Sequence, residues 1–267
     1  MRAFFYAKII DNIARFLYNC PMQKILSTMR RAITDYNMIS DGDKIVVGVS
    51  GGKDSLLLLT ALKAFQRFSP AKFDLAAITI DMGFKDASVA EKQALSAYIA
   101  ELGVPYYVVD TDIAEVIFEA RKESNPCSLC SKMRRGALNN KAIELGFNKL
   151  ALGHHADDVV QTMLLSLLYE GRFSTFQPVS FMDRSGITLI RPFIYTSESD
   201  VKGAVNKLNL PVLHNPCPAN KHTQREYVNE LVKRLTKEVP YARERMLGAI
   251  YHPERANLWQ KPDKSDD

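Results

Sequence analysis

The stretch KIVVGVSGGKDSLLLL, residues 44–59, passes from strand chemistry to helix chemistry through a pair of glycines. Its first part is a short β-branched run, 45–49, of the kind found in buried parallel strands. Its last part opens an apolar helical pattern over 54–66. A glycine turn between such a strand and helix lets backbone N–H groups approach an anion, and the helix dipole favours negative charge there.

Strand and helix patterns alternate along the rest of the chain. Further apolar strand patterns lie at 73–80, 105–109, 149–153 and 187–192, and helical patterns at 24–38, 88–102, 131–145, 156–169, 197–208 and 222–247. Repeated strand–helix units predict an α/β fold, a Rossmann-like doubly wound parallel sheet of about five strands with helices on both faces. Ligands bind such sheets beyond the carboxyl ends of the strands.

Three parts are expected along the chain. Residues 1–40 form an N-terminal helical extension, 41–213 the α/β domain with a Cys-x-x-Cys insertion, and 214–267 a loop with a third cysteine followed by a C-terminal helical segment. The N-terminal apolar residues recur at helical spacing and are interrupted by charges, which favours an amphipathic helix over a signal peptide.

Composition and charge narrow the class of protein. With 46% hydrophobic and 24% charged residues, the chain has the make-up of an ordinary globular protein. No apolar run approaches the roughly 20 residues of a membrane span, so we expect no membrane association and a cytoplasmic location. The net charge of +5 is concentrated in 1–40 and 121–149. Such basic segments suit a polyanion such as RNA, although a solvated basic face would look the same.

The glycine turn supplies a set of candidate phosphate ligands: Ser50, Gly51, Gly52, Lys53, Asp54 and Ser55. Lys53 can neutralise phosphate charge, and a carboxylate at Asp54 makes sense if it holds Mg²⁺. The pattern is neither a Walker A loop nor a dinucleotide fingerprint, because Asp54 follows the lysine and position 50 is serine. The alternative is a tight strand-to-helix turn with an incidental Asp–Ser cap.

A second polar segment, LGHHADDVVQTMLLSLL, spans 152–168 after the fourth strand. It sits at the end of that strand, on the same sheet edge as the phosphate loop, so we expect its first polar residues to face that loop. A helix cap with a surface carboxylate is the alternative for the histidine–aspartate segment.

Three of the four cysteines stand in related contexts. Cys127 and Cys130 form a Cys-x-x-Cys after Asn-Pro, and Cys217 follows a second Asn-Pro. From the residues alone, three uses stay open: an iron–sulfur cluster, a zinc site completed by His214 or His222, and a persulfide or disulfide couple. The fourth, Cys20, lies in an apolar helical pattern and is expected to be an ordinary cysteine.

The motifs together resemble a known family. SGGKDS resembles the PP-loop signature of ATP pyrophosphatases, and LGHHADDVVQT resembles a segment of PP-loop tRNA-modifying enzymes. With CSLCSKMRRGAL, IRP and the late NPC, the chain is similar from about residue 24 to about residue 250 to the tRNA 2-thiocytidine synthetase family.

This resemblance implies a PP-loop ATPase fold and an ATP-dependent tRNA sulfurtransferase. ATP would activate the C2 oxygen of the cytidine at tRNA position 32, and sulfur would replace that oxygen. Asp157 would be catalytic, and Asp157 or Asp158 would join Asp54 in holding Mg²⁺. The nucleotide site would be formed by Gly153, His154, His155 and Asp158, with the backbone around Ile80 and Met82, at the end of the second strand, contacting adenine or ribose. Cys127, Cys130 and Cys217 would hold a 4Fe-4S cluster with one iron open, and with Lys53 and Asp54 they would form the catalytic group. The implied partners are tRNA and a sulfur donor, either a cysteine desulfurase or free sulfide, and a homodimer is expected.

Two features depart from the family pattern. Asn220 stands where many members carry a second Cys-x-x-Cys, and the short tail leaves little room for a separate tRNA-binding domain. The expected tRNA contacts are therefore basic residues in three helical segments. They are the N-terminal helix, then Lys132, Arg134 and Arg135, and then Lys221, Arg225, Lys233 and Arg234.

Three other functions compete with this one. A lysidine-synthetase-like ligase would use the same loop with an amine and would not need the cysteines. A cluster-dependent desulfidase of thiolated nucleobases would need no ATP, so the SGGKDS loop argues against it. A non-catalytic, zinc-stabilised RNA-binding module would bind tRNA without consuming ATP.

Overall fold

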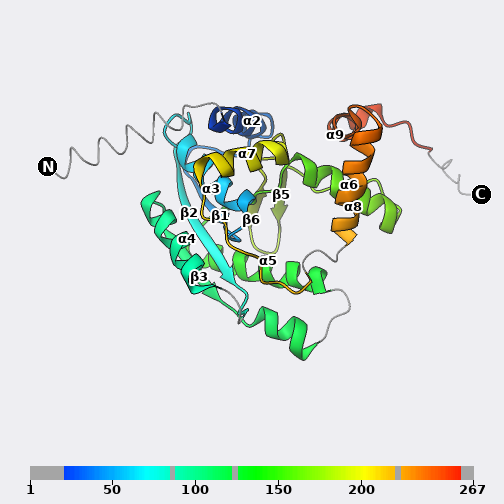
Figure 1. Ribbon diagram of the computed structural model, residues 1–267. Coiled ribbons are helices and arrows are strands. Elements are labelled where there is room, and N and C mark those ends of the chain that lie inside the picture. The colour runs from blue at the N-terminus through cyan, green and yellow to red at the C-terminus, as the bar shows by residue number, and fades with distance from the viewer. Residues whose placement is uncertain (1–20, 85–87, 122–125, 220–223, 260–267) are drawn as a thin grey trace, which may run out of the picture. The chain divides into compact units, whose positions relative to one another are not determined.

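The computed structural model describes residues 21–84, 88–121, 126–219 and 224–259 (Figure 1). The chain divides into two compact units, Met1–Asp158 with Phe176–Thr223, and Val159–Thr175 with Gln224–Asp267. Residues 1–20, half of the expected N-terminal extension, lie outside the described part of the chain. The expected boundaries after residues 40 and 213 stay predictions.

The first unit contains a single mixed sheet. Its strands are β1 (Asp43–Gly48), β2 (Phe73–Asp81), β3 (Tyr106–Asp110), β4 (Lys149–Ala151), β5 (Val179–Met182) and β6 (Ile187–Ile190). They run in the order β3-β2-β1-β4-β6-β5, with every neighbouring pair parallel except β5 and β6. The predicted doubly wound α/β fold is confirmed, with six strands instead of about five.

The additional strand is β5, which pairs antiparallel with β6 at the edge of the sheet. Sequence reasoning missed it because four residues before a turn carry little periodic signal. Ser185 and Gly186 close the hairpin by donating to the carbonyl of Met182, and Gly186 has a φ of 67°.

The helices follow the predicted order with small shifts at their ends. They are α2 (Pro21–Asp35), α3 (Lys53–Phe65), α4 (Val89–Glu101), α5 (Pro126–Glu144), α6 (Ala156–Glu170), α7 (Glu198–Leu208), α8 (Gln224–Glu238) and α9 (Ala242–Tyr251). A π-helical turn, Glu115–Ala120, and a short 3-10 helix, Pro253–Arg255, complete the described elements.

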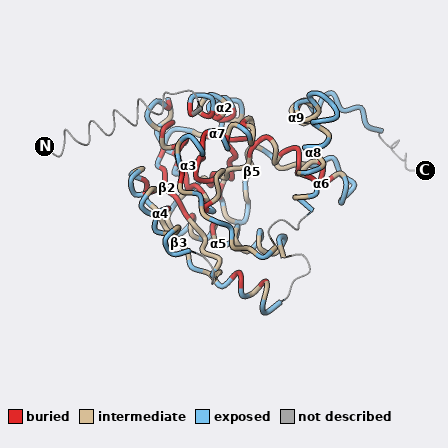
Figure 2. Tube along the Cα trace, in the orientation of Figure 1, coloured by how far each residue is buried: buried red, intermediate tan, exposed pale blue. Residues whose placement is uncertain are grey.

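Helices cover both faces of the sheet, as the buried residues in Figure 2 show. On one face, Leu138 and Ala142 of α5 pack on a cluster of strand side chains that includes Val46, Ile78 and Leu150. Side chains alternate along a strand, so Ile45 and Val47 point to the other face, where α3 contacts β1.

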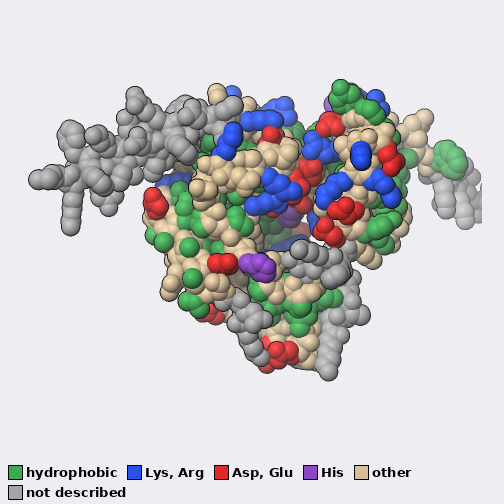
Figure 3. All heavy atoms as spheres, in the orientation of Figure 1, with side chains coloured by type: hydrophobic (Ala, Val, Ile, Leu, Met, Phe, Trp, Pro, Cys, Tyr) green, Lys and Arg blue, Asp and Glu red, His purple; other side chains and the backbone are tan. Residues whose placement is uncertain are grey.

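Helix α3 carries apolar side chains around most of its circumference, because other elements pack against most of its surface. Its residues 55–62 are all buried, and it contacts α2 and α7 as well as the sheet. Polar contacts join those outer helices to each other. The Lys24 ammonium of α2 lies 2.7 Å from the Asp200 carboxylate of α7, and the Thr28 hydroxyl lies 2.7 Å from that of Thr196, just before α7. Figure 3 shows basic and acidic side chains interspersed on the face in view.

The second unit is helical. Val228 and Val232 of α8 and Leu247 of α9 are buried, and the Gln161 amide donates to Asn229 Oδ1 at 3.3 Å. The expected continuous helix over 222–247 is instead two helices that break at Pro240, where proline cannot continue the backbone hydrogen bonding. No helix among the described residues is long and apolar enough to cross a membrane.

Candidate functional site

The site lies where the strand order reverses. β1 is flanked by β2 on one side and β4 on the other, and the chain continues outward in opposite directions from the two. This is the switch point at which doubly wound sheets bind ligands beyond the carboxyl ends of their strands. The loops that follow β1 and β4 are therefore neighbours, although about 100 residues separate them in sequence.

Gly153 brings the two loops into direct contact. A Cβ added at this position would lie 2.8 Å from the carbonyl carbon of Asp54 and 3.0 Å from the amide nitrogen of Ser55. Only glycine therefore allows the backbone after β4 to approach the start of α3 this closely.

The phosphate loop is held in shape by its own serines. The Ser50 amide donates to Ser55 Oγ at 3.1 Å, and Ser55 Oγ donates to the Gly52 carbonyl at 3.0 Å. Gly51 has a φ of 79°, a conformation that favours glycine. No described side chain caps the start of α3, so its first amide groups are left available to an anion. Their contact with phosphate stays a prediction.

Lys53 is held between two carboxylates. Its ammonium lies 3.0 Å from Asp54 Oδ2 and 3.2 Å from Glu198 Oε1. Burial disfavours the charge, but the carboxylates of Asp54 and Glu198 outweigh it and raise the pKa of Lys53. Glu198 also pairs with Lys202 at 3.0 Å. Sequence reasoning missed Glu198, because a glutamate in the first turn of α7 reads as an ordinary helix start.

His155 links the two loops. Its ring is 4% exposed, with Nε2 3.6 Å from Asp54 Oδ1 and Nδ1 3.4 Å from Asp158 Oδ2. Asp158 also accepts a hydrogen bond from the His155 amide at 3.0 Å, and Asp157 accepts one from the Glu198 amide at 2.7 Å. Each of these two aspartates thus uses an oxygen to secure a helix start.

Asp54 presents an oxygen for a ligand. Its Oδ1 is buried and accepts no hydrogen bond from any described residue, whereas its Oδ2 faces Lys53. A buried carboxylate oxygen without a donor is costly unless a cation or another donor meets it. The position beside the phosphate loop fits a hard cation such as Mg²⁺.

His154 points elsewhere. Its ring centroid lies 4.9 Å from that of Phe176, and its Nδ1 accepts a hydrogen bond from Arg191 Nε at 3.3 Å. The two adjacent histidines, expected together at the nucleotide, therefore have different neighbours. Arg191 and Phe176 were missed as site residues, although the IRP motif had marked the segment, because only the fold brings them beside His154.

The residues expected near adenine lie at the carboxyl end of β2. Ile80 pairs with Val109 of β3, and the Met82 carbonyl accepts a hydrogen bond from the Ala114 amide at 2.9 Å. Both are on the same sheet edge as the phosphate loop, on the β2 side of it. Their contact with a nucleotide stays a prediction.

The three cysteines come from two segments. Cys127 and Cys130 lie in the first two turns of α5, and Cys217 lies in the irregular segment after α7; all three are free thiols. Burial raises the pKa of the Cys130 thiol, Arg134 lowers it, and the nearby Cys217 and Cys127 raise it further. Cys20 and Asn220 lie outside the described residues.

The segment that carries Cys217 is fastened to the phosphate loop. The Leu213 amide donates to the Gly51 carbonyl at 2.9 Å, and the Leu213 side chain would lie 3.0 Å from a Cβ at Gly51. The next residue, His214, donates its amide to Glu91 of α4 at 3.0 Å.

Within the described ranges, no three His, Cys, Asp or Glu side chains are grouped as a single metal ion would need. Three thiols from two segments are nevertheless the donor set that soft metals and iron–sulfur clusters take. His222, a possible fourth zinc ligand, is outside those ranges.

The expected tRNA-contact residues are distributed over both units. Lys132, Arg134 and Arg135 lie on α5, and Arg225, Lys233 and Arg234 on α8; Lys221 is not among the described residues. Lys233 pairs with Glu230 at 2.7 Å. Their contact with RNA stays a prediction.

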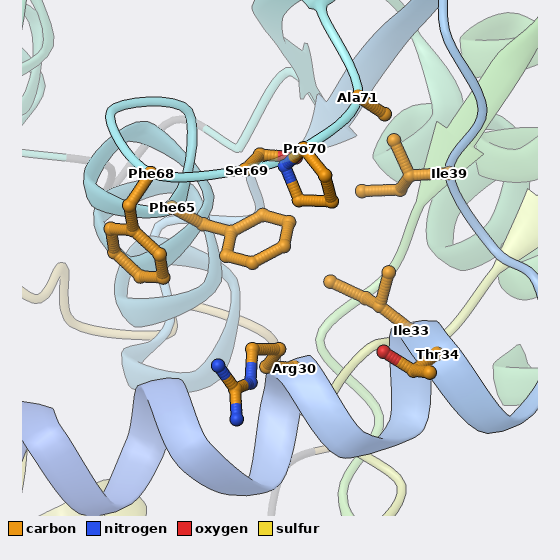
Figure 4. Close-up of a pocket in the computed structure, with 9 residues that line it drawn as sticks. All are labelled: Arg30, Ile33, Thr34, Ile39, Phe65, Phe68, Ser69, Pro70 and Ala71. Atoms are coloured by element: carbon orange, nitrogen blue, oxygen red, sulfur yellow. The ribbon is translucent and has the colours of Figure 1, made fainter.

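A cavity of about 360 Å³ lies away from this site (Figure 4). It is lined by Arg30 and Ile33 of α2, by Phe65 at the last turn of α3, and by Phe68 and Pro70 beyond it. Since α3 begins at the phosphate loop, the cavity is at the opposite end of that helix. Its walls carry one cation, two hydroxyl side chains and apolar groups but no carboxylate, unlike the switch-point site.

Residues 21–235 match the PP-loop domain family. The chain belongs to this family. It is 37% identical over 236 residues to the tRNA-cytidine(32) 2-sulfurtransferase of Pelobacter propionicus, covering 86% of this chain and 87% of that protein. It is 36% identical to the protein of the same name from Geobacter sulfurreducens, covering 88% and 91%.

A solved structure extends the comparison. The U34-tRNA thiolase NcsA from Methanococcus maripaludis, determined with its [4Fe-4S] cluster, superposes with a TM-score of 0.73 at 25% identity. The match covers 89% of this chain and 80% of that one.

Proposed function

We propose that this protein is an ATP-dependent tRNA sulfurtransferase that replaces the C2 oxygen of the cytidine at tRNA position 32 with sulfur. The observation that carries the proposal is the hydrogen bond from Leu213 to Gly51, which fastens the Cys217 segment to the phosphate loop. A nucleotide-activating loop and a thiol-bearing segment are thereby neighbours. The names of the relatives supply the substrate.

The first step is adenylation of the cytidine. The C2 oxygen attacks the α-phosphorus of ATP, and pyrophosphate leaves. The amide groups at the start of α3 and the Lys53 ammonium stabilise the charge on the phosphates. Asp54, through its otherwise unbonded Oδ1, would hold Mg²⁺, which neutralises the pyrophosphate as it forms.

The positions of the two nearby aspartates suggest how they act. Asp157 and Asp158 each secure a helix start while lying within 3.8 Å of the His155 ring. We assign them the role of holding His155 against Asp54, so that the metal-binding carboxylate keeps its orientation.

The second step is substitution of the activated oxygen. A sulfur nucleophile adds to C2, AMP leaves with the former C2 oxygen, and the thiocarbonyl forms. Cys127, Cys130 and Cys217 would hold a 4Fe-4S cluster, which when bound supplies an iron coordination position for sulfur.

The proposal also includes a sulfur donor, an oligomeric state and a location. The sulfur donor is a cysteine desulfurase or free sulfide. The protein acts as a homodimer and works in the cytoplasm, where tRNA is modified. Each stays a prediction.

The test is a thiolation assay on protein purified without oxygen. Wild type is incubated with unmodified tRNA, ATP, Mg²⁺ and sulfide, and 2-thiocytidine is quantified by mass spectrometry of the digested tRNA, alongside iron, zinc and acid-labile sulfide. Cys217→Ala is compared with Cys20→Ala, which makes the same change at the cysteine outside the three-thiol set.

We expect ATP-dependent 2-thiocytidine and about four irons per chain in wild type and Cys20→Ala, and neither in Cys217→Ala. Thiolation that persists in Cys217→Ala would refute the cysteine role. If the protein holds one zinc per chain and binds tRNA without consuming ATP, the RNA-binding module is favoured. If it attaches an amine to tRNA and does not need the cysteines, a lysidine-synthetase-like ligase is favoured.

A further inference from the structure

Arg191 is a buried cation without a carboxylate partner. The residue is 8% exposed, and no described Asp or Glu side chain forms an ion pair with it. Buried guanidinium groups ordinarily meet a carboxylate, because a charge removed from water is costly unless an opposite charge compensates it. In the folded chain, therefore, something other than a described acidic side chain must compensate this charge.

Neutral acceptors bind only two of the three guanidinium nitrogens of Arg191. Nε donates to His154 Nδ1 at 3.3 Å, and Nη1 donates to the Gln177 carbonyl and, at 3.4 Å, to Ser180 Oγ. The guanidinium lies over the Phe176 ring, 4.8 Å from its centroid. Nη2 makes no hydrogen bond to a described residue, so one edge of the fork is available to a ligand.

A second cation increases the need for an anion. Burial first, and then the positive charge of Arg135 on α5, lower the pKa of Arg191 to about 10. Arg135 is exposed at the surface, three residues before Leu138, which packs in the same buried cluster as Leu189 near the end of β6. Two like charges that approach each other in a partly desolvated place favour the binding of a shared anion. Arginine forks bind phosphate oxygens in two-point contacts.

The place of Arg191 in the sheet indicates which phosphate binds. It directly follows β6, which lies beyond β4, whereas the expected adenine contacts lie beside β2 on the other side of the phosphate loop. ATP phosphates are already served by Lys53 and the start of α3. Arg191 is therefore on the side of the phosphate loop opposite to the expected adenine contacts, where a second substrate would not compete with the nucleotide.

We infer that Arg191 and Arg135 form a phosphate-binding site, separate from the phosphate loop, that takes a backbone phosphate of the RNA beside the target nucleotide. The choice of RNA as the ligand rests on the proposed function, whereas the anion site itself rests on the uncompensated charge. Arg191 is a positioning residue in this account, since it fixes the acceptor and not the reacting atoms.

Direct binding measurements test the site without requiring turnover. Dissociation constants are measured by equilibrium methods for two probes, ATP with Mg²⁺ and a synthetic anticodon stem–loop with cytidine at position 32. The variants are Arg191→Lys, which keeps the charge but loses the fork, and Arg135→Gln, which removes an exposed charge without disturbing packing. Arg184→Gln, an exposed arginine of the β5–β6 turn, is the matched control.

We expect Arg191→Lys to weaken stem–loop binding by about 10-fold or more, and Arg135→Gln by a few-fold, with a reduced salt dependence. Arg184→Gln should bind as wild type, and ATP affinity should be unchanged in all three. A loss of ATP affinity equal to the loss for the stem–loop would assign the arginines to the nucleotide and overturn the inference.

Unchanged stem–loop binding in both Arg191→Lys and Arg135→Gln, with thermal unfolding midpoints as in wild type, would also overturn it. The outcome is separable from that of the proposed function. Wild-type protein that binds the stem–loop through Arg191 but forms no 2-thiocytidine would leave the site standing and remove the proposed chemistry.

Discussion

Substitution of Gly153 by alanine tests whether the contact between the two loops controls the site. The added Cβ would lie 2.8 Å from the Asp54 carbonyl carbon and 2.9 Å from its oxygen, where ordinary contacts begin at 3.4 Å. These are backbone atoms, which cannot rotate away as a side chain can. The start of α3 must therefore move by at least about 0.6 Å relative to β4.

The expected effects follow from that displacement. Overpacking of this kind costs about 1–3 kcal/mol of unfolding free energy. The same shift moves Asp54 and the first amides of α3 away from the phosphates, and misplacements near 1 Å cost on the order of 100-fold in rate. We expect tRNA-dependent AMP formation by Gly153→Ala to fall by about 10- to 100-fold.

The assay follows AMP release by chromatography, ATP binding by equilibrium dialysis, and unfolding by heat. Gly203→Ala is the control, because Gly203 is an exposed position of α7 at which an added Cβ meets nothing within 4 Å. It should raise stability by about 0.5–1 kcal/mol and leave activity unchanged. If Gly153→Ala binds ATP and forms AMP as wild type does, the close approach of Gly153 to Asp54 does not determine the conformation of the phosphate loop.

Three further predictions concern stability and coupling. Lys149→Met should cost about 3 kcal/mol in urea unfolding, because it leaves the Asp43 carboxylate, 2.6 Å from the ammonium and 8% exposed, without its cation. Glu198→Gln should cost about 1 kcal/mol at neutral pH. Burial alone would raise the pKa of Glu198, but Lys202 and Lys53 lower it overall. The difference in unfolding free energy between Glu198→Gln and wild type should therefore vanish as the pH falls through that lowered pKa. A pH-independent difference would contradict this account. Leu213→Ala should speed hydrogen exchange in 209–219 and raise the KM for ATP, and unchanged exchange would mean that the segment is held by other contacts.

Most helices and strands could be predicted from the sequence, because each is marked by the local spacing of its apolar residues. Apolar, β-branched runs such as the one before SGGKDS predicted five of the six strands in order. The glycines at the ends of helices marked where the next strand could begin. The short β5 and the break at Pro240 were missed, the first because it has too few residues for a pattern and the second because a helical pattern continues on both sides of the proline.

The neighbours of the site residues required the tertiary structure. Sequence indicated the candidate residues, because the phosphate loop, the histidine–aspartate segment and the three cysteines each have a local signature. The strand order places β4 beside β1 and so brings His155 to Asp54, whereas the packing of α7 on α3 brings Glu198 to Lys53. The tertiary structure likewise gives His154 and His155 different neighbours. Such contacts join segments far apart in the chain, and local periodicity carries no information about them, because they form only when burial of both sheet faces selects one arrangement of the strands.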